Sequence, residues 1–467
     1  MAARRIAAML VYRPRAFPVA AAFAAMLAVA APWAVAAPAA TPPSSTPPEK
    51  KPATAVKKTA PAAAKPGSSR PKAGSTKKKP AAVAKPVVPP PPPPPPPVEL
   101  IGITIMPTNT LRDGPPSGQF DGAGRRGPAA RFESQPVQGV SSIKPGPTAG
   151  AWWALSDNGF GARWNSPDYR LCIYLFDVRP RTEAGTDSRT ALQAVIELSD
   201  PAKFFPFRLA DESEPERLLT GADADPESLV AMPDDTFWVG DEFGPWLLHF
   251  SVDGELLSPP VELPDGVHSP DHPLVVARAE EPRIGHSRGF EAMDLAGDDK
   301  TLVTILEGPV TGDAPKSLRV QRYDTAAGKW LPFTLIYELD ADTVSVTDLS
   351  RIEGNRYVVI ERDDLEGDAA KAKRVYSIDL DKALPGKPLP KKLVIDLLSI
   401  GNTRGLAQVA TPGAPFRFPY LTIESIQVLD RKHVVIVNDN NFPATGGRGA
   451  NVPDATEWIW LELQNPL

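Results

Sequence analysis

The chain has little cysteine and little histidine, and both shortages narrow the chemistry that it can perform. Of its 467 residues, one is cysteine and five are histidine. Cys172 cannot form a disulfide within the chain, so the folded part must be stabilised by its core. The surrounding segment, RLCIYLFDV, alternates like a buried strand. This pattern predicts a packed small hydrophobe at Cys172, and neither a cysteine nucleophile nor a cysteine-based zinc site.

Helical periodicity is also scarce. No long segment repeats apolar residues at spacings of three and four, whereas short runs of valine, isoleucine and tryptophan alternate with polar residues throughout. Turns such as DGE, GDD, EGN and DRK separate these runs, and tight hairpins prefer this chemistry. The sequence therefore predicts an all-β chain.

The first 36 residues lack acidic side chains. They carry four arginines, followed by an apolar, alanine-rich stretch that ends in Ala-Val-Ala at residues 34–36. This arrangement predicts a cleaved secretory signal peptide over residues 1–36 and a periplasmic or secreted protein. The alternative is an uncleaved anchor in the inner membrane, because the apolar stretch approaches the length that spans a bilayer.

Residues 37–97 consist mainly of proline, alanine, lysine, serine and threonine, and end in nine consecutive prolines. Too little apolar bulk is present to offset the entropy of ordering, so a disordered, partly polyproline II linker is expected. The segment holds eleven basic residues and a single acid, Glu49. It would act either as a solvated spacer or as a weak contact with anionic polymers or lipid of the cell envelope.

The remaining residues, 98–467, are strongly acidic. The whole chain holds 51 Lys and Arg against 56 Asp and Glu, and without the basic arm these numbers become 36 and 55. Nucleic-acid binders need a positive surface, so this composition argues against a nucleic-acid partner. It favours cations instead.

The acidic part repeats one pattern five times: a short acidic motif, an apolar run, and a second cluster of acids or amides. The clearest copies span residues 225–245, 288–309, 346–364 and 423–443, and a weaker copy spans 139–161. Each copy is typical of a strand, a polar turn and a second strand, which ends in SDN, GDE, LEG, ERDD or NDNN. Such repeats predict a single β-propeller with one functional face.

The number of copies predicts the number of blades. Five copies predict five blades, and the poorly patterned regions 111–136 and 196–217 leave room for a sixth. Residues 458–464 are expected to pair with residues 98–105, so that strands from both ends of the domain close one blade.

The acidic strand ends predict a metal site. In a ring of blades, equivalent strand ends converge around one channel mouth, where so many carboxylates cannot stay ionised without a cation. Oxygen-only ligands favour calcium, although each single acid could instead make ordinary turn hydrogen bonds. The predicted metal ligands are Asp157, Asp225, Glu227, Asp241, Glu242, Glu307, Asp363 and Glu424, with Asn158 in the same cluster. The predicted catalytic carboxylates are Glu291, Glu361 and Asp439, and the predicted substrate-binding residues are Arg163, Arg288, Arg362 and Asn440.

The repeats resemble a known family in four segments: RGFEAM (288–293), WVGDEFGP (238–245), VVIERDD (358–364) and VVIVNDNNFP (434–443). This is the phytase-like family, also described as the esterase-like activity of phytase domain, which occurs in exported bacterial proteins. The resemblance covers residues 139–463. It implies a β-propeller and a hydrolase of phosphoric or carboxylic esters. A bound calcium would then hold a small phosphoester, and the arginines would grip its phosphate oxygens.

Two other functions are compatible with the same residues. A non-catalytic envelope binding module would use the acidic cup to hold a ligand or a protein partner. A serine esterase would use Ser287, because Gly285 to Gly289 read G-x-S-x-G, the nucleophile elbow. The following segment, FEAMDLAGDDKTLV, reads as a strand, whereas the elbow requires a helix there.

One histidine motif stands apart from the repeats. His268 and His272 in HSPDH have the spacing of a metal-binding pair on a helix. Pro270 between them argues against a helix, so the sequence predicts a surface loop.

Overall fold

The computed structural model describes residues 97–185, 187–442 and 446–467. The expected signal peptide and all but the last residue of the expected linker lie outside the described residues. Within the described ranges, no helix is long and apolar enough to cross a membrane.

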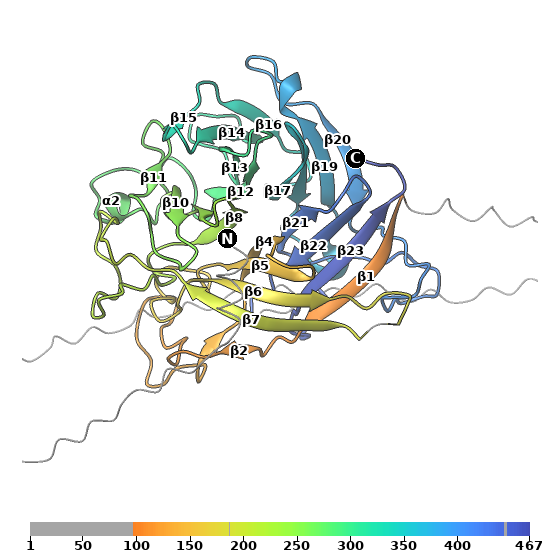
Figure 1. Cartoon of the computed structure of the whole chain (residues 1–467), viewed down its shortest axis with the longest axis horizontal. Helices are drawn as coiled ribbons and strands as arrows, with labels where there is room; N and C mark the ends of the chain where they lie inside the picture. The colour runs from red at the N-terminus through yellow and green to blue at the C-terminus, as the bar shows by residue number, and fades with distance from the viewer. Residues whose placement is uncertain (1–96, 186, 443–445) are drawn as a thin grey trace, which may run out of the picture. The chain divides into compact units, whose positions relative to one another are not determined.

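Five antiparallel sheets surround one axis as the blades of a β-propeller (Figure 1). Their innermost strands contact one another in sequence order, and the fifth contacts the first. These strands are β4 (Val140–Pro145), β8 (Pro226–Ala231), β12 (Phe290–Leu295), β17 (Ser345–Glu353) and β21 (Ile423–Val428). The fold is therefore all-β with five blades, as the five sequence copies predicted.

Each blade adds strands outward from the axis. The second strands are β5 (Ala151–Ser156), β9 (Phe237–Asp241), β13 (Thr301–Leu306), β18 (Arg356–Arg362) and β22 (His433–Asn438). The third strands are β6 (Cys172–Arg179), β10 (Trp246–Phe250), β14 (Ser317–Asp324), β19 (Lys373–Asp379) and β23 (Thr456–Leu463). The outermost are β7 (Arg189–Glu197), β11 (Val261–Glu262), β15 (Lys329–Trp330) with β16 (Leu335–Glu338), β20 (Lys391–Asp396) and β1 (Val98–Met106).

The fifth blade closes the ring with strands from both ends of the domain. β1 pairs antiparallel with β23, with Val98 opposite Leu463 and Met106 opposite Thr456. This confirms the predicted closure. The regions that left room for a sixth blade form the two-residue strands β2 (Leu111–Arg112) and β3 (Gln135–Pro136), the last two residues of β7, and irregular segments.

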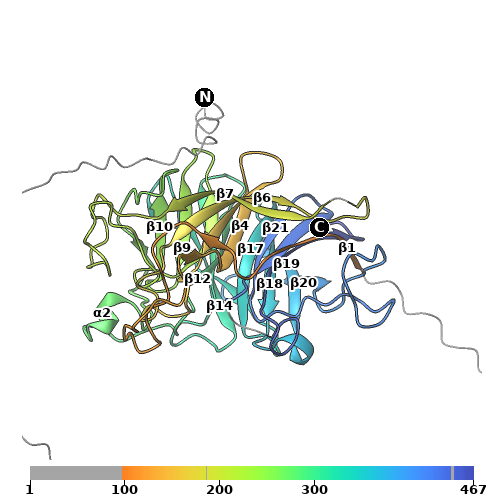
Figure 2. The same ribbon diagram turned by 90° about the horizontal axis from the view of Figure 1, so that it is seen from below.

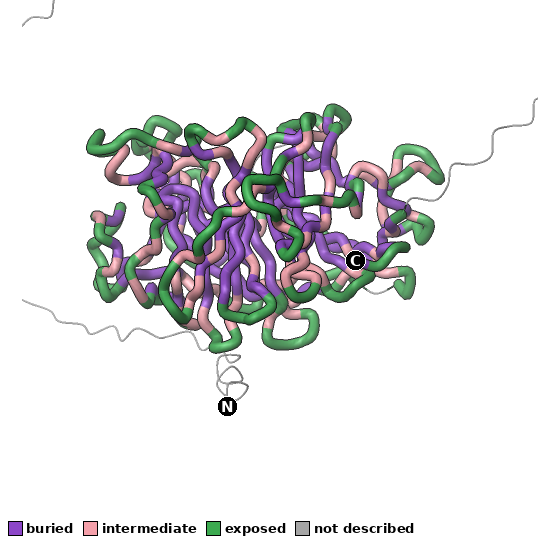
Figure 3. Tube along the Cα trace, turned by 90° about the horizontal axis from the view of Figure 1, so that it is seen from above, coloured by how far each residue is buried: buried purple, intermediate pink, exposed green. Residues whose placement is uncertain are grey.

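Apolar strand residues of neighbouring blades pack together in shared clusters. Figure 2 shows the blades turned by 90°, and in Figure 3 the buried residues lie mainly along the strands and the exposed residues mainly in the loops. Between the first and fifth blades, Trp152 meets Trp458 edge to face, with ring centroids 5.7 Å apart. Cys172 is fully buried in the same cluster, as expected for a packed hydrophobe. Such interlocking aromatic side chains fix the blades relative to one another.

The histidine motif does not form the exposed loop that the sequence predicted. His268 and His272 are 4% and 0% exposed. The four-residue helix α2 (Pro273–Val276) begins directly after His272, which caps it. The prediction was wrong because the segment packs under Phe207 and Trp246, whose ring centroids each lie 5.4 Å from that of His272.

Candidate functional site

Every innermost strand begins with an irregular register near its second residue. The shift falls after Val140, Pro226, Phe290, Val346 and Ile423. A bulge leaves a residue out of the ladder and redirects its side chain. In the order of the blades, the bulge positions hold Ser141, Glu227, Glu291, Thr347 with Asp348, and Glu424. Three of the five bulges therefore put a glutamate at the same end of the axis.

The residue that follows the second strand of a blade lies at the same end of the axis as the bulge residues. In four blades its backbone N–H donates to the carbonyl just before the innermost strand, at 3.0 Å in every case. The four donors are Asp157, Glu242, Glu307 and Asp439. In the fourth blade Val346 pairs with Glu361, so Arg362 takes the equivalent position. The second set is thus four acids and one arginine.

The glutamates of the first set and the four acids of the second, together with Asp225, form a cluster that we call the acidic ring: Asp157, Asp225, Glu227, Glu242, Glu291, Glu307, Glu424 and Asp439. Carboxylate oxygens of Asp225, Glu227 and Glu242 lie within 4.8 Å of one another. Those of Glu242, Glu291 and Glu307 do the same, so Glu242 joins the two groups. Asp157 and Glu227 are partly exposed, and the other members are buried.

Burial raises the pKa of most of the carboxyl groups in the ring. Burial, and then the charge of neighbouring carboxylates, raises the pKa of Asp157 to about 7 and that of Asp439 to about 8. Burial raises the pKa of Glu424 to about 7, against the opposing effect of Arg362. The same causes raise the pKa of Glu242 and Glu291 well above the ordinary value. A cation in the ring would offset both the repulsion and the loss of hydration.

Two arginines compensate one side of the ring. Arg288 Nη1 donates to Glu307 Oε2. Arg362 Nη2 lies 3.3 Å from Glu307 Oε1 and 3.9 Å from Glu424 Oε1. No such pair reaches Asp225, Glu227 or Glu242 among the ion pairs of the described residues. The charge of the ring is therefore least compensated toward the second blade.

Several buried atoms at the ring have no hydrogen-bond partner. They are the acceptors Glu424 Oε2 and Asp439 Oδ1 and the donors Asn440 Nδ2 and Arg362 Nε. Buried polar atoms are nearly always satisfied, so each orphan costs free energy unless a ligand or water supplies its partner. The unpaired acceptors suit a cation, and the unpaired donors suit an anion beside it.

An ion pair crosses the axis deeper in the propeller. Lys144 Nζ in the first blade lies 3.8 Å from Asp294 Oδ2 in the third blade and 3.5 Å from the Met293 carbonyl. Lys144 lies three residues after the bulge residue Ser141, and Asp294 lies three residues after the bulge residue Glu291. These blades are not neighbours, so the pair spans the axis below the ring. The sequence pattern did not single out Lys144, although a lysine in a buried strand is a signal.

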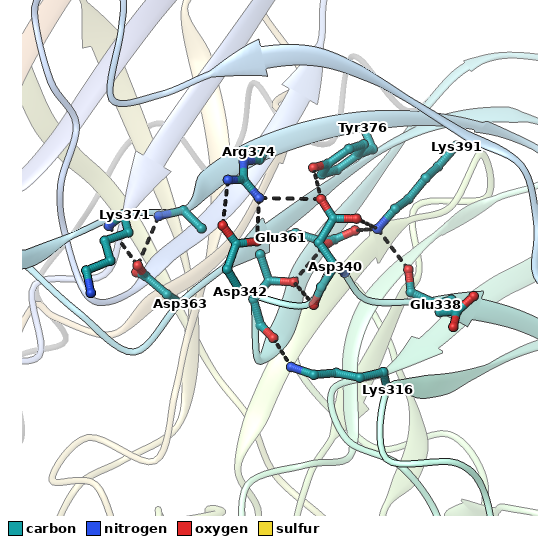
Figure 4. A network of polar contacts seen from close by, with 12 residues as sticks. Lys316, Glu338, Asp340, Asp342, Glu361, Asp363, Lys371, Arg374, Tyr376 and Lys391 are labelled. Atoms are coloured by element: carbon teal, nitrogen blue, oxygen red, sulfur yellow. Dashed lines mark hydrogen bonds and ion pairs between the residues drawn. The ribbon is translucent and has the colours of Figure 1, made fainter.

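The predicted metal ligands Asp241 and Asp363 and the predicted catalytic residue Glu361 lie outside the ring, because each is one residue away from the position that faces it. Asp241 Oδ1 and Oδ2 accept from the backbone N–H groups of Asp225 (2.7 Å) and Gly244 (2.6 Å), and so hold a turn. Glu361 points into a network between the third and fourth blades, where it accepts from Tyr337 at 2.5 Å and Thr343 at 2.7 Å and pairs with Lys391 (Figure 4).

Asp363 also turns away from the axis. Its Oδ2 accepts from the backbone N–H groups of Lys371 (2.7 Å) and Ala372 (2.9 Å), and its Oδ1 lies 3.0 Å from Lys373 Nζ (Figure 4 shows the contact with Lys371). The neighbouring Arg362 takes the axial position instead. The structure thus does not bring Asp241, Glu361 or Asp363 together with the predicted metal ligands that form the acidic ring.

The remaining predicted residues lie at the rim. Arg163 donates to the carbonyl of Asp271, and Asn158 Oδ1 accepts from Gly161 N–H at 2.7 Å. Asp157 also lines a cavity of about 260 Å³ together with Arg131, Phe160 and Phe442. The ring therefore adjoins a hollow that is lined by Arg131 and by the aromatic side chains of Phe120, Phe160 and Phe442.

Ser287 does not sit in an esterase elbow. It is exposed with φ of 47°, and the strand β12 follows it where a nucleophile elbow needs a helix. Among the hydrogen bonds of the described residues, none joins Ser287 Oγ to a histidine.

Comparisons with known proteins agree with this architecture. The model of the Phytase-like family, described as the esterase-like activity of phytase, matches residues 135–442. An uncharacterized secreted protein of Arthroderma benhamiae is 27% identical over 120 residues, which are 21% of this chain and 22% of that protein. The alignment thus spans about a fifth of the length of that relative.

Solved structures are more distant. A luciferin-regenerating enzyme matches with a TM-score of 0.36 at 10% identity, over 78% of this chain and 94% of its own. An exo-β-1,3-galactanase of Phanerochaete chrysosporium also reaches 0.36 at 10% identity, over 77% and 64%. These scores are too low to carry an argument about either chain.

Proposed function

The chain belongs to the Phytase-like family, and on this premise we propose that it is an exported, calcium-dependent hydrolase of small phosphoesters. The observation that carries the proposal is the acidic ring, which buries more carboxylates than its two arginines can compensate. Export rests on the amino-terminal sequence pattern and on the description of the fungal relative as secreted.

The ring suits calcium by the chemistry of its donors. Asp225, Glu227, Glu242 and Glu291 offer carboxylate oxygens within the two groups that could hold an ion. Glu424 Oε2 and Asp439 Oδ1 add buried oxygens without partners. Calcium takes six to eight oxygen ligands in flexible geometry, and this set contains no nitrogen or sulfur donor. Asp157 would complete the set at the rim.

A bound calcium would neutralise the carboxylates, attract phosphate oxygens and make a coordinated water more acidic. The residues of the chain then have separable tasks. Glu291 and Asp439 would exchange protons with the reacting groups through the carboxylate oxygen that is not on the ion, because burial raises the pKa of Glu291 well above its ordinary value and that of Asp439 to about 8. Asn440 Nδ2 and Arg362 Nε, both unpaired, donate to the phosphate together with Arg288.

The residues that face away from the axis hold the site in shape. Asp241 fixes the turn that presents Glu242, and Glu361 and Asp363 flank Arg362 and anchor its strand. Lys144 and Asp294 close the axis below the ring, so substrate would enter and product leave at one end. Arg163 and Arg131 add positive charge at that rim.

The test is release of phosphate from phytate and from simple phosphomonoesters by the purified chain, with calcium and again after chelation. We expect calcium-dependent release that Glu291→Gln and Asp439→Asn remove. Asp342→Asn is the matched control, since it removes a carboxylate that is half exposed and bound to Arg374. If the folded, calcium-replete chain releases no phosphate from these substrates, the hydrolase is refuted for them and the ring is better explained as a non-catalytic binding module.

A further inference from the structure

A second group of potential metal ligands lies at the outer edge of the second blade. Glu262 is the last residue of β11, and His268 and His272 belong to the connection that leads from β11 through α2 to β12 (Figure 1). β11 and α2 both lie at the periphery of the propeller, away from the axis. The acidic ring and the proposed hydrolase activity use none of these three residues.

The three side chains lie beside one another. The imidazole rings of His268 and His272 stack with centroids 3.8 Å apart and an angle of 7° between their planes. Glu262 Oε2 lies 3.8 Å from His268 Nε2, and Glu262 Oε1 lies 3.7 Å from His272 Nε2. All three residues offer a ligand atom within 4.8 Å of the other two.

Both Nε2 atoms are buried and have no hydrogen-bond partner. The side chains of His268 and His272 are 6% and 0% exposed, so water does not satisfy them freely. Each ring leaves a buried polar atom unpaired beside a carboxylate, which costs free energy if the rings serve only to pack the core. Because stacked rings direct their Nε2 lone pairs in parallel, one ring would have to turn before an ion between the three groups could bind both nitrogens.

The spacing is close to what a small divalent ion needs. Zinc binds histidine nitrogen and carboxylate oxygen at about 2.0–2.2 Å, which places tetrahedral ligand atoms roughly 3.3–3.6 Å apart. The two nitrogen-to-oxygen distances of 3.7 and 3.8 Å exceed this by only a few tenths of an ångström. The side chain of Glu262 is 46% exposed and is free to make that adjustment.

A supporting contact behind one ligand is typical of metal sites. His268 Nδ1 lies 2.7 Å from Glu280 Oε2, and a carboxylate in this place orients a ligating histidine and makes it more basic. His272 Nδ1 accepts a hydrogen bond from Leu274 N–H at 3.2 Å. This hydrogen bond would be lost if an ion bound Nε2.

We propose that Glu262, His268 and His272 form a second metal site, separate from the acidic ring, that takes zinc or a similar divalent transition ion. Two imidazole nitrogens and one carboxylate oxygen suit zinc and not calcium, and the exposed side near Glu262 leaves a fourth position for water. The ion would stabilise the connection between β11 and β12, which includes Arg288. That connection is already tied to His268, whose carbonyl accepts from Arg283 N–H at 2.8 Å.

The experiment is titration of the purified, metal-free chain with Co²⁺ as a spectroscopic substitute, followed by displacement with Zn²⁺. We expect a cobalt absorption spectrum of low coordination number that zinc removes, and a zinc-dependent rise in melting temperature. Glu262→Gln, His268→Asn and His272→Asn should each weaken binding by tenfold or more. Glu280→Gln should weaken it about tenfold by releasing His268.

Two control variants distinguish this metal site from metal binding elsewhere in the chain. His433→Asn removes a histidine that is bound to Asp430 on another blade, and it should leave cobalt and zinc binding unchanged. Glu291→Gln changes the acidic ring and should also leave them unchanged. Glu262→Gln alters an exposed side chain, so it gives a folded variant even if a histidine variant does not fold.

Absence of cobalt and zinc binding by the folded chain would overturn the proposal. Binding that persists unchanged in Glu262→Gln and in the folded histidine variants would overturn it as well, because the ion would then lie elsewhere. Loss of binding in Glu262→Gln, with binding kept in His433→Asn and Glu291→Gln, would establish the site.

Discussion

The acidic ring and the polar network between the third and fourth blades contain the same kinds of residues but differ in how the acids are paired. In the network, Asp340 contacts Arg374 at 3.4 Å and Lys391 at 2.8 Å, and Glu361 pairs with the same lysine (Figure 4). In the ring, Glu242 and Glu291 face other carboxylates, and burial raises the pKa of both. The first region carries its own counter-charges, whereas the two arginines of the second compensate only one side of the ring.

This difference shows which acids are available to a ligand. A buried carboxylate that is already paired contributes to the folded structure and has little left to offer an ion. A buried carboxylate among like charges destabilises the empty protein, so a cation that relieves the repulsion binds well. The predictions below test the contrast between the two regions.

The largest effect is expected on activity. Glu291→Gln and Asp439→Asn should each lower kcat/KM for calcium-dependent phosphate release by about 1,000-fold, because each removes a group that exchanges a proton. Asp342→Asn, which changes the paired region by the same single charge, should stay within about twofold. Steady-state kinetics with saturating calcium measures all three, and equal losses in ring and control variants would contradict the distinction.

Stability should respond in opposite directions in the two regions. Asp363→Asn leaves the fully buried ammonium of Lys373 without its carboxylate, and should lower the free energy of unfolding by about 3 kcal/mol. Glu242→Gln keeps the acceptor for Gly289 N–H while removing a like charge, and should raise it by about 1 kcal/mol in chelator. Denaturant titration without metal measures both, and two changes of the same sign would argue against the account.

The pH dependence follows from the raised pKa values of the ring. Asp157, Asp225 and Asp439 keep protons up to about pH 7 or 8 when folded, whereas unfolded carboxyl groups lose them near pH 4. The folded state thus binds more protons between these values, and the stability of the metal-free chain should fall as the pH rises from about 4 to about 8.

Calcium should reverse this loss. At 100 times its dissociation constant, a ligand adds about 2.7 kcal/mol of stability. Unfolding at pH 5 and pH 8, each with calcium and with chelator, measures the effect. Stability that rises with pH in chelator would contradict the proposed origin of the shifted pKa values.

A smaller effect is expected at the rim. Arg288 contacts Glu307 and is one third exposed, so it can reach both the ring and a substrate. Arg288→Lys keeps the charge but loses the two-pronged grip on phosphate, and should raise KM about tenfold with little change in kcat. A fall in kcat at unchanged KM would instead assign Arg288 to the transition state.

The blade pattern could be predicted from the sequence because each copy carries its own strands and turns. The closing pair of β1 and β23 followed from their matched apolar patterns at the two ends of the domain. The acids that end the strands were also evident, and most of the predicted metal ligands do meet in the ring.

The sequence could not predict which of two adjacent acids faces the axis. Asp241 and Glu242 differ by one position, yet only Glu242 reaches the ring, because bulges set which side chain faces the axis. Glu361 likewise looked equivalent to the ring acids, but Tyr337, Thr343 and Lys391, which surround it, are set in place only by the packing of the blades. Burial of His268 and His272 depends on Phe207 and Trp246, which are distant in the sequence.

Calcium titration calorimetry on the purified, metal-free chain tests the central claim most directly. The account predicts saturable calcium binding by the wild-type chain and by Asp342→Asn, and affinity at least tenfold weaker in the double variant Glu242→Gln, Glu291→Gln. Binding of undiminished affinity in the folded double variant, or no calcium binding by the folded wild-type chain, would contradict it.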